Sequence, residues 1–357
     1  MGKQLITRYF LGANAYSGFY SLYDGFCAGP NDFLRVIKGG PGTGKSNLMR
    51  RIGAAAEAKG HAVEYILCSG DPDSLDGVYI PALGVGYADG TAPHVLDPEL
   101  FGVSGNYLDV GACCARVSDS AARREIAELT HAYREHYSAA YSYLAASRAA
   151  DPSARGTLLT GEDLESVRRR ARSAAERELP ASGSDGGERR RRFLRAITCR
   201  GEIFCSDTLE ALCPRVYALE SALGLSGVFL AEIAAAAKRR GYGYVICPDP
   251  LDPERLDAVL LPGRGAAYVA SSPGQELPIK PSRRLHLDSA LLRGMSKDAK
   301  KALEADRRAA ASLRRCGIEA LASAKRLHDE LEAVYRPYVS FPALDELAAN
   351  EIAALGL

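Results

Sequence analysis

The stretch Gly39-Gly40-Pro41-Gly42-Thr43-Gly44-Lys45-Ser46 fits the pattern G-x-x-x-x-G-K-[ST] at every fixed position. An apolar, β-branched run at 33–37 precedes it and predicts a buried strand. The segment 47–59 is rich in Leu, Met, Arg, Ala and Glu and predicts a helix, which Gly60 would close. The pattern therefore lies between a strand and a helix, which is the context that a phosphate-binding loop needs.

The residue types in this loop suit an anionic ligand. Glycines let the backbone N–H groups converge on one point, and the positive end of the following helix dipole adds to the attraction. Lys45 is predicted to contact the β- and γ-phosphates of a nucleotide, and the Ser46 hydroxyl to ligate Mg²⁺. The alternative is a Gly- and Pro-rich turn without a ligand. The predicted nucleotide-binding residues are Gly39, Gly40, Pro41, Gly42, Thr43, Gly44, Lys45, Ser46 and Asn47.

Length and composition set wider limits. A chain of 357 residues has room for two domains, and 47% apolar with 25% charged residues is ordinary for a soluble globular protein. A net charge of +1 argues against nucleic acid as an obligatory partner. The N-terminus lacks the apolar core of a signal peptide, and no apolar run reaches 18 residues, so we expect a cytoplasmic protein without membrane contact. The nine cysteines form no C-x-x-C pair, which favours reduced thiols over a zinc site.

A further motif, which ends in an aspartate, follows the loop in the sequence. A short apolar run at 83–88 ends in Asp89-Gly90-Thr91, as a Walker B strand does. The Asp89 carboxylate would then hold Mg²⁺ together with Ser46. The sequence thus predicts Lys45 and Asp89 as catalytic residues, and Ser46 and Asp89 as metal ligands. The alternative is an ordinary strand-to-turn junction, because Asp-Gly also occurs in many turns.

The chain contains an internal repeat. Residues of the first half recur in the second half at nearly constant separations over some ninety residues, which predicts two tandem copies of one α/β unit. Ile52, Gly60, Asp71, Asp76 and Pro81 match Ile233, Gly241, Asp252, Asp257 and Pro262 at an offset of 181 (257 − 76 = 181). Phe10, Gly18 and Asp24 match Phe193, Gly201 and Asp207 at an offset of 183, and Leu108-Asp109 matches Leu287-Asp288 at 179.

The copies differ where phosphate chemistry would take place. Leu225 replaces Lys45, and Ala270 replaces Asp89. The second copy loses both the phosphate lysine and the magnesium carboxylate, so we expect a degenerate site that binds no nucleotide.

The same comparison separates structural from functional candidates among the residues of the first copy. Asp71, Asp76 and Pro81 have identical counterparts in the degenerate copy, which favours structural roles for them. Asp73 and His94 have different counterparts there, which gives a weaker indication of function.

Helical segments link and follow the two copies. One apolar stripe begins at Ile126, a further helix is expected at 162–178, and the Ser- and Gly-rich stretch 180–187 is a predicted linker. The domains are therefore expected at 1–180 and 188–357.

The arginines at 189–192 would supply an arginine finger, bind an acidic partner, or form a solvated segment. A heptad seam at 310–334 is predicted to pack against the helix near 121–149 or against another chain.

Several segments together resemble a little-characterised bacterial family of tandem P-loop ATP-binding proteins. They are the loop at 38–51, Cys68 with Asp71-Pro72, Leu75-Asp76-Gly77-Val78-Tyr79-Ile80-Pro81, and Asp89-Gly90-Thr91-Ala92-Pro93-His94. The resemblance implies ATP binding and hydrolysis but no particular substrate. Many members of the family carry a P-loop in both halves, and this chain departs from that pattern at Leu225.

The predicted fold is α/β, with two tandem P-loop NTPase-like units, mainly parallel sheets and helical appendages. The leading functional hypothesis is a Mg²⁺-dependent ATPase with one site in the first half, coupled to rearrangement of the halves or of an unidentified protein partner. One alternative is a small-molecule kinase whose acceptor binds near Asp71 and Asp73. Another is a nucleotide sensor that binds ATP and barely hydrolyses it.

Overall fold

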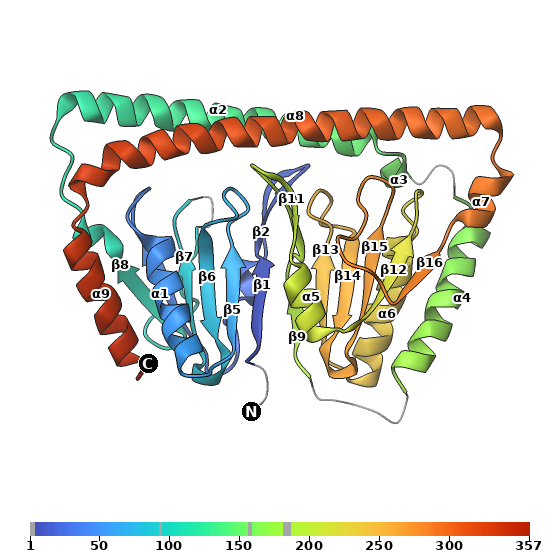
Figure 1. The fold of residues 1–357 in the computed structure, drawn as a ribbon, viewed down its shortest axis with the longest axis horizontal. Coiled ribbons are helices and arrows are strands. Elements are labelled where there is room, and N and C mark those ends of the chain that lie inside the picture. Colours follow the sequence, from blue (N-terminus) through green and yellow to red (C-terminus); the bar gives the residue numbers. More distant parts are fainter. Residues whose placement is uncertain (1–3, 93–94, 156–158, 181–186) are drawn as a thin grey trace.

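The computed structural model describes residues 4–92, 95–155, 159–180 and 187–357. His94 and residues 181–186 of the predicted linker lie outside these ranges. The described chain forms two six-stranded mixed sheets, with helices packed around them. Figure 1 shows the sheets side by side, with two long helices running over both. This is the two-unit α/β architecture that the sequence predicts.

The first sheet combines parallel neighbours with one reversed strand. Its strands in spatial order are β1 (Ile6–Phe10), β5 (Val63–Leu67), β6 (Leu75–Ile80), β7 (Val85–Asp89), β4 (Phe33–Lys38) and β8 (Gly105–Asp109). Only β6 runs antiparallel to its neighbours, and the sequence did not predict this reversal. Strand β4 lies between β7 and β8 and is parallel to both, which places the loop after β4 at the carboxyl edge of three parallel strands.

The second sheet repeats the first strand for strand. Its strands in matching order are β9 (Arg189–Arg191), β13 (Tyr244–Pro248), β14 (Leu256–Leu261), β15 (Ala266–Ser271), β12 (Arg215–Glu220) and β16 (Arg283–His286). Strand β14 is the reversed one and thus corresponds to β6. Identical order and identical directions agree with the constant offsets in the sequence.

The helices also occur in matching positions. They are α1 (Lys45–Ala58), α2 (Ser120–Ala150), α3 (Pro152–Arg155), α4 (Gly161–Glu178), α5 (Ser206–Leu212), α6 (Ser226–Arg240), α7 (Ser289–Gly294), α8 (Lys297–Tyr335) and α9 (Phe341–Ala354). Single 3₁₀ turns cover η1 (Tyr23–Gly25), η2 (Pro81–Leu83), η3 (Val110–Cys113), η4 (Pro262–Arg264) and η5 (Arg336–Tyr338). In the part of the chain that is described, no helix is long and apolar enough to cross a membrane.

The two halves share one core at their junction. Phe10 and Phe193 are equivalent in the repeat, and each donates its backbone N–H to the carbonyl of the other at 2.9 Å. Both side chains are fully buried in a cluster that also contains Tyr9, Tyr23 and Phe26. The aromatic residues around the first strand therefore include major core residues. Two hairpins, β2 (Gly12–Ala15) with β3 (Gly18–Ser21) and β10 (Arg195–Thr198) with β11 (Gly201–Phe204), flank this junction.

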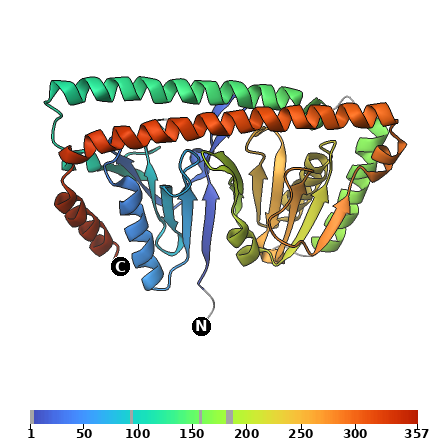
Figure 2. The same ribbon diagram turned by 45° about the horizontal axis from the view of Figure 1, so that its top comes forward.

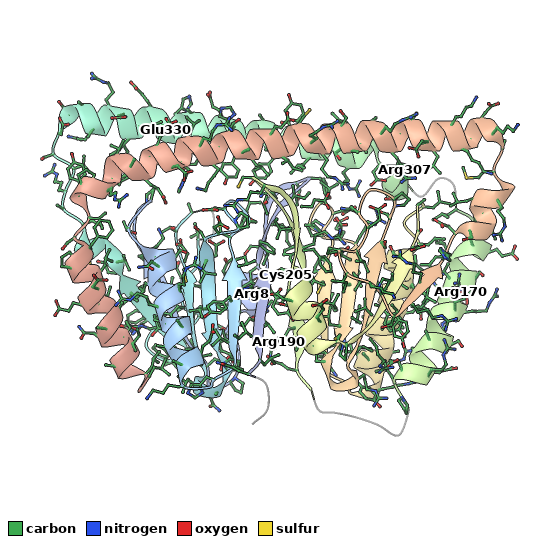
Figure 3. All side chains as sticks on the ribbon, in the orientation of Figure 1. Arg8, Arg170, Arg190, Cys205, Arg307 and Glu330 are labelled. Carbon is green, nitrogen blue, oxygen red and sulfur yellow. The ribbon has the colours of Figure 1, made fainter. Side chains whose placement is uncertain are left out.

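A buried ion pair also joins the halves. The Glu64 carboxylate of β5 accepts a hydrogen bond from Arg192 Nε at 2.7 Å, and Arg190 Nη1 lies 3.1 Å from its other oxygen. Both Glu64 and Arg192 are 2% exposed. Figure 3 shows Arg190 near this junction, with Arg8 and Cys205 also between the sheets. The arginines at 189–192 thus do not form a uniformly solvated segment, because Arg192 neutralises a buried carboxylate.

We expect Glu64→Gln to lower the free energy of unfolding by about 3–5 kcal/mol, because it leaves a buried guanidinium without its counter-charge. Urea denaturation followed by circular dichroism measures this change. The control is Asp73→Asn, which removes an ion pair between Asp73 and Arg200 that also joins the halves but is exposed. Similar losses from both variants would contradict a stabilising role for the buried pair.

The long helices α2 and α8 pack along each other over the carboxyl ends of the parallel strands, as Figures 1 and 2 show. Leu303, Ala310, Gly317, Ala324 and Leu331 recur every seven residues on α8 and are buried. A Cβ atom at Gly317 would lie 3.1 Å from the Leu144 side chain of α2, so glycine permits the close approach of the helices. The predicted seam therefore packs against the counterpart helix within the same chain.

The last helix of each half packs against the other half. Helix α4 contributes Val167 and Ala171 to the core around α6, and Leu179, which follows the helix, belongs to the same core. Helix α9 contributes Leu344 and Ala348 to the core around α1. The sheets lie within the predicted ranges 1–180 and 188–357, but the helical appendages are exchanged between them. Helices α1 and α6 are thus each covered by a segment from the opposite half.

Candidate functional site

The loop between β4 and α1 adopts a compact turn that depends on glycine. Gly42 and Gly44 have φ angles of 68° and 81°, a left-handed conformation that residues with a Cβ atom rarely adopt. The Thr43 hydroxyl donates a hydrogen bond to the Gly40 carbonyl at 2.8 Å and fixes the turn. Helix α1 then begins at Lys45, so its N-terminal N–H groups lie beside the loop.

Lys45 and Asp89 lie together at this loop, as the sequence predicts. Asp89 is the last residue of β7 and pairs in register with Ile37 of β4, which brings its side chain to the edge where the loop begins. The Lys45 ammonium lies 3.6 Å from Asp89 Oδ2, with 12% and 14% of the two side chains exposed. It also donates to the carbonyls of Gly39 at 3.0 Å and Gly40 at 2.8 Å. The ammonium is thus held over the loop in a largely enclosed position.

The other predicted site residues lie in or beside the loop, but Ser46 and Asp89 have hydrogen-bond partners outside it. Ser46 Oγ accepts a hydrogen bond from the Leu75 N–H at 2.9 Å, so the hydroxyl faces the start of β6. Asp89 Oδ1 accepts from the backbone N–H and the hydroxyl of Thr91 at 2.9 and 2.6 Å. Asn47 is exposed on the first turn of α1, whereas Gly39, Gly40 and Pro41 are half-buried. Ser46 and Asp89 therefore border the same loop, and each has its own hydrogen-bond partner.

Glu332 of α8 covers the loop, and nothing in the sequence predicted this contact. Its Oε1 accepts a hydrogen bond from the Gly42 N–H at 3.1 Å. A Cβ atom at Gly42 would lie 3.2 Å from the Glu332 carbonyl oxygen, and one at Gly44 would lie 3.2 Å from Leu344 of α9. The second half thus places a carboxylate on one of the amides that a phosphate oxygen would use. The heptad pattern gave no signal, because it identifies the buried seam and not the residues beside it.

The acidic turn between β5 and β6 is engaged in contacts with the rest of the chain. Asp71 lies 3.4 Å from the Lys325 ammonium of α8 and accepts from the Ser74 hydroxyl at 3.0 Å. Asp73 pairs with Arg200 of the second half. Both carboxylates that the kinase alternative would use for an acceptor therefore have cationic partners.

In the second half, a carboxylate of the chain itself fills the corresponding loop. Asp288 Oδ2 accepts hydrogen bonds from the N–H groups of Ala222 at 2.6 Å and Leu223 at 3.0 Å, and from the Ser221 hydroxyl at 2.9 Å. Asp288 is 5% exposed, and Leu225, which replaces the phosphate lysine, is fully buried. The converging amides persist in this half, but they bind an internal anion.

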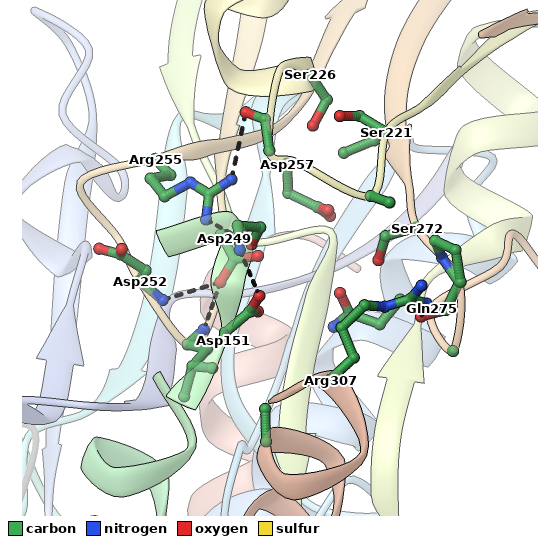
Figure 4. Close-up of a pocket in the computed structure, with 18 of the residues that line it drawn as sticks. Asp151, Ser221, Ser226, Asp249, Asp252, Arg255, Asp257, Ser272, Gln275 and Arg307 are labelled. Carbon is green, nitrogen blue, oxygen red and sulfur yellow. Dashed lines mark hydrogen bonds between the residues drawn. The ribbon is translucent and has the colours of Figure 1, made fainter. Parts of the chain in front are cut away.

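A polar cavity of about 120 Å³ lies next to this second loop. Figure 4 shows Ser221 and Ser226 near one end of it and Arg307 of α8 near another. The charged residues of its lining are Arg148, Arg255, Arg307, Arg314, Asp151, Asp249, Asp252 and Asp257. Four arginines and four aspartates balance formally, whereas a triphosphate needs an excess of positive charge. Burial raises the pKa of Asp257 to about 6, so desolvation disfavours the charged form of this carboxyl group.

One further group could attract a metal ion. Among the described residues, the ligand atoms of His328, Asp329 and Glu332 on α8 lie within 4.8 Å of one another. However, Asp329 already pairs with the Lys325 ammonium, and Glu332 bonds to Gly42. These contacts favour a role in holding α8 near the loop.

The nine cysteines are all free, and Cys27, Cys205, Cys213 and Cys247 are buried. Comparisons with protein-family models, with curated proteins and with solved structures found no match. The relation to tandem P-loop ATP-binding proteins therefore stays a prediction that is based on the motifs.

Proposed function

We propose that this protein binds Mg²⁺-ATP at the loop Gly39–Ser46 and hydrolyses it slowly, with one site per chain. The observation that carries the proposal is the position of the Lys45 ammonium, 3.6 Å from the Asp89 carboxylate at the carboxyl edge of the first sheet. A lysine and an aspartate that are 44 residues apart (89 − 45 = 44) meet beside a glycine turn that begins a helix. These are the parts that phosphoryl transfer from a nucleotide requires.

Each residue has a distinct task in this proposal. The N–H groups of Gly42 to Lys45 donate to phosphate oxygens, and Lys45 offsets the charge that develops on the transferred group. Ser46 and Asp89 would hold Mg²⁺, which when bound supplies Lewis-acid stabilisation of the phosphates. Because the loop is half-buried, the effective dielectric constant there is lower than in water, and each of these electrostatic interactions is stronger.

Phosphate release by the purified chain tests the proposal. We expect slow release from ATP with Mg²⁺, and loss of release when EDTA removes the metal or when Lys45 is replaced. Release that persists in Lys45→Ala would contradict the assignment of the loop.

The kinase and sensor alternatives predict other outcomes. A kinase would show little turnover until an acceptor is added, and a sensor would bind ATP without release in a single-turnover assay. The ion pairs of Asp71 with Lys325 and of Asp73 with Arg200 weigh against an acceptor site there, because an acceptor would have to displace both cations.

The contact between Glu332 and the loop suggests how nucleotide binding is coupled to the rest of the molecule. A phosphate at the Gly42 amide would displace the Glu332 carboxylate, and α8 connects this point to the second half. We therefore propose that α8 moves relative to the first sheet when nucleotide binds, and that an unidentified protein partner responds to this movement. We also propose a cytoplasmic location. The α2–α8 seam is already packed within the chain, so self-association through it is not required.

We expect Glu332→Gln to tighten ATP binding by about fivefold, or about 1 kcal/mol, because a neutral side chain competes less for the Gly42 amide and no longer repels phosphate. Isothermal titration with a non-hydrolysable ATP analogue measures the change. Glu330→Gln is the matched control, since Glu330 is exposed on the same turn of α8. Equal affinities for wild type and Glu332→Gln would show that Glu332 does not compete with nucleotide.

A further inference from the structure

The cavity in the second half lies at the same edge of its sheet as the phosphate loop does in the first half. The second loop, the turn between β13 and β14, and the segment after β15 all contribute to its lining. Helix α8 covers it with Arg307 and Arg314, which are about two helical turns apart (314 − 307 = 7) and therefore lie on one face. Ala310 and Ala311 lie between these arginines, and their small side chains leave space under the helix. The volume of about 120 Å³ is close to the roughly 150 Å³ of a cavity that admits benzene, so a small organic molecule fits.

Opposite charges face each other across this cavity. Figure 4 shows Asp249 and Asp257 on the side opposite Arg307. Asp249 Oδ1 accepts hydrogen bonds from two backbone N–H groups of its turn, both at 2.8 Å, and this fixes the carboxylate. Arg307 Nη2 donates to a backbone carbonyl of the segment after β15 at 2.9 Å. Backbone contacts therefore hold an acidic and a basic group apart, with the cavity between them.

Two buried polar atoms of the lining have no hydrogen-bond partner among the described residues. They are Asp252 Oδ1, an acceptor, and Arg314 Nε, a donor. The other oxygen of Asp252 pairs with Arg148 at 2.9 Å, and Arg314 Nη1 donates to Glu202 at 2.7 Å, so both side chains are fixed. Asp252 is 3% exposed. An unsatisfied polar atom that is buried is unfavourable, and a ligand that carries both donors and acceptors would satisfy atoms of both kinds.

The comparison of the halves shows that these charges are specific to the second half. Asp249 matches Cys68 at the offset of 181 (249 − 68 = 181), and Arg255 of the lining matches Ser74 at the same offset (255 − 74 = 181). The second half thus lacks the phosphate lysine but carries an acidic and a basic residue that the first half does not have. Loss of nucleotide binding alone does not explain them, because placing ionised groups in a largely buried region is unfavourable.

The acidic side of the cavity favours a cationic group. Burial raises the pKa of Asp249 above its usual range and that of Asp257 to about 6, and the charge of Asp249 adds to the increase at Asp257. An ammonium group beside these carboxylates would stabilise their ionised forms. This electrostatic preference agrees with the arrangement of the side chains.

We propose that this cavity binds a small zwitterion of the amino-acid class, with its ammonium group toward Asp249 and Asp257 and its carboxylate toward Arg307. The equal numbers of arginines and aspartates in the lining suit a ligand without net charge. The site is separate from the loop Gly39–Ser46, and the inference does not rest on ATP binding.

Thermal unfolding of the full chain, without nucleotide, tests this inference. The probes are glycine, L-alanine, L-serine and L-threonine, each added alone. We expect at least one of them to raise the Tm by about 2 °C or more at saturating concentration. Three analogues of L-serine serve as controls: ethanolamine lacks the carboxylate, glycerate lacks the ammonium, and glycerol lacks both. Each should give a smaller shift than the best amino acid, because it leaves one or both charged sides of the cavity without a partner.

Variants of the two charged sides show where the ligand binds. Arg307→Gln should abolish the shift, as should Asp249→Asn, which keeps an oxygen for the two backbone N–H groups but removes the charge. Arg308→Gln is the matched control, since Arg308 is the next residue of α8 and is exposed. It should retain the shift of wild type.

The remaining outcomes would overturn the inference. A wild-type Tm that none of the four amino acids raises would do so, as would an equal shift with glycerol, which would indicate a cavity for water or neutral polar molecules only. A shift that persists in Arg307→Gln would place the ligand elsewhere. If Asp249→Asn does not fold, Arg307→Gln decides the matter, because the Arg307 side chain is 22% exposed and its replacement is tolerated more easily.

Discussion

Lys45→Ala is expected to weaken ATP binding by about 100-fold, which corresponds to about 3 kcal/mol, and to abolish detectable turnover. The side chain supplies the cation of the loop, and it lies largely enclosed between the loop carbonyls and Asp89. Its removal would leave phosphate oxygens next to the Asp89 carboxylate without a counter-charge. Isothermal titration measures the affinity, and far-ultraviolet circular dichroism shows whether the fold persists.

Lys59→Ala is the control for this variant, because Lys59 is an exposed lysine at the other end of α1. It should bind ATP with the affinity of wild type. If Lys45→Ala also kept that affinity, the loop Gly39–Ser46 would not be the nucleotide site.

Asp89→Ala is expected to reduce Mg²⁺-dependent turnover by about 100-fold and to change nucleotide affinity much less. Metal ligation contributes most where charge develops during transfer, so the loss should appear in the rate rather than in ground-state binding. Steady-state phosphate release and titration with the analogue, made on the same preparation, separate the two effects.

Asp97→Asn provides the comparison, since the Asp97 side chain is 62% exposed in the segment that follows the same strand. Its turnover should equal that of wild type. An Asp89→Ala variant with full activity would remove Asp89 from the site and leave the metal to another carboxylate.

Local chemistry made the centre of the site predictable. The strand, the glycine turn and the helix around Lys45 follow from residue types within one short stretch, and the structure forms β4 and α1 there. Asp89 was predictable because the strand that ends in it is apolar, and the structure brings it to Lys45. The repeat offsets predicted two equivalent units, and the matching strand orders agree with them.

The contacts between distant segments were not predictable in this way. An apolar stripe shows that a helix face is buried but does not show which surface covers it. The exchange of α4 and α9 between the halves and the contact of Glu332 with Gly42 are therefore visible only in the structure. The same holds for Asp288. The repeat offsets match it to Asp109, but its side chain fills the second loop through hydrogen bonds to residues that are 65 to 67 positions away in the sequence.

The number of nucleotides bound per chain tests the central claim most directly. Calorimetric titration of the full chain with a non-hydrolysable ATP analogue and Mg²⁺ should give one site in wild type and none at the same concentrations in Lys45→Ala. Asp288 already occupies the amides of the second loop, and Leu225 provides no cation there. Two sites in wild type, with one remaining in Lys45→Ala, would contradict the account, as would one site that Lys45→Ala leaves unchanged.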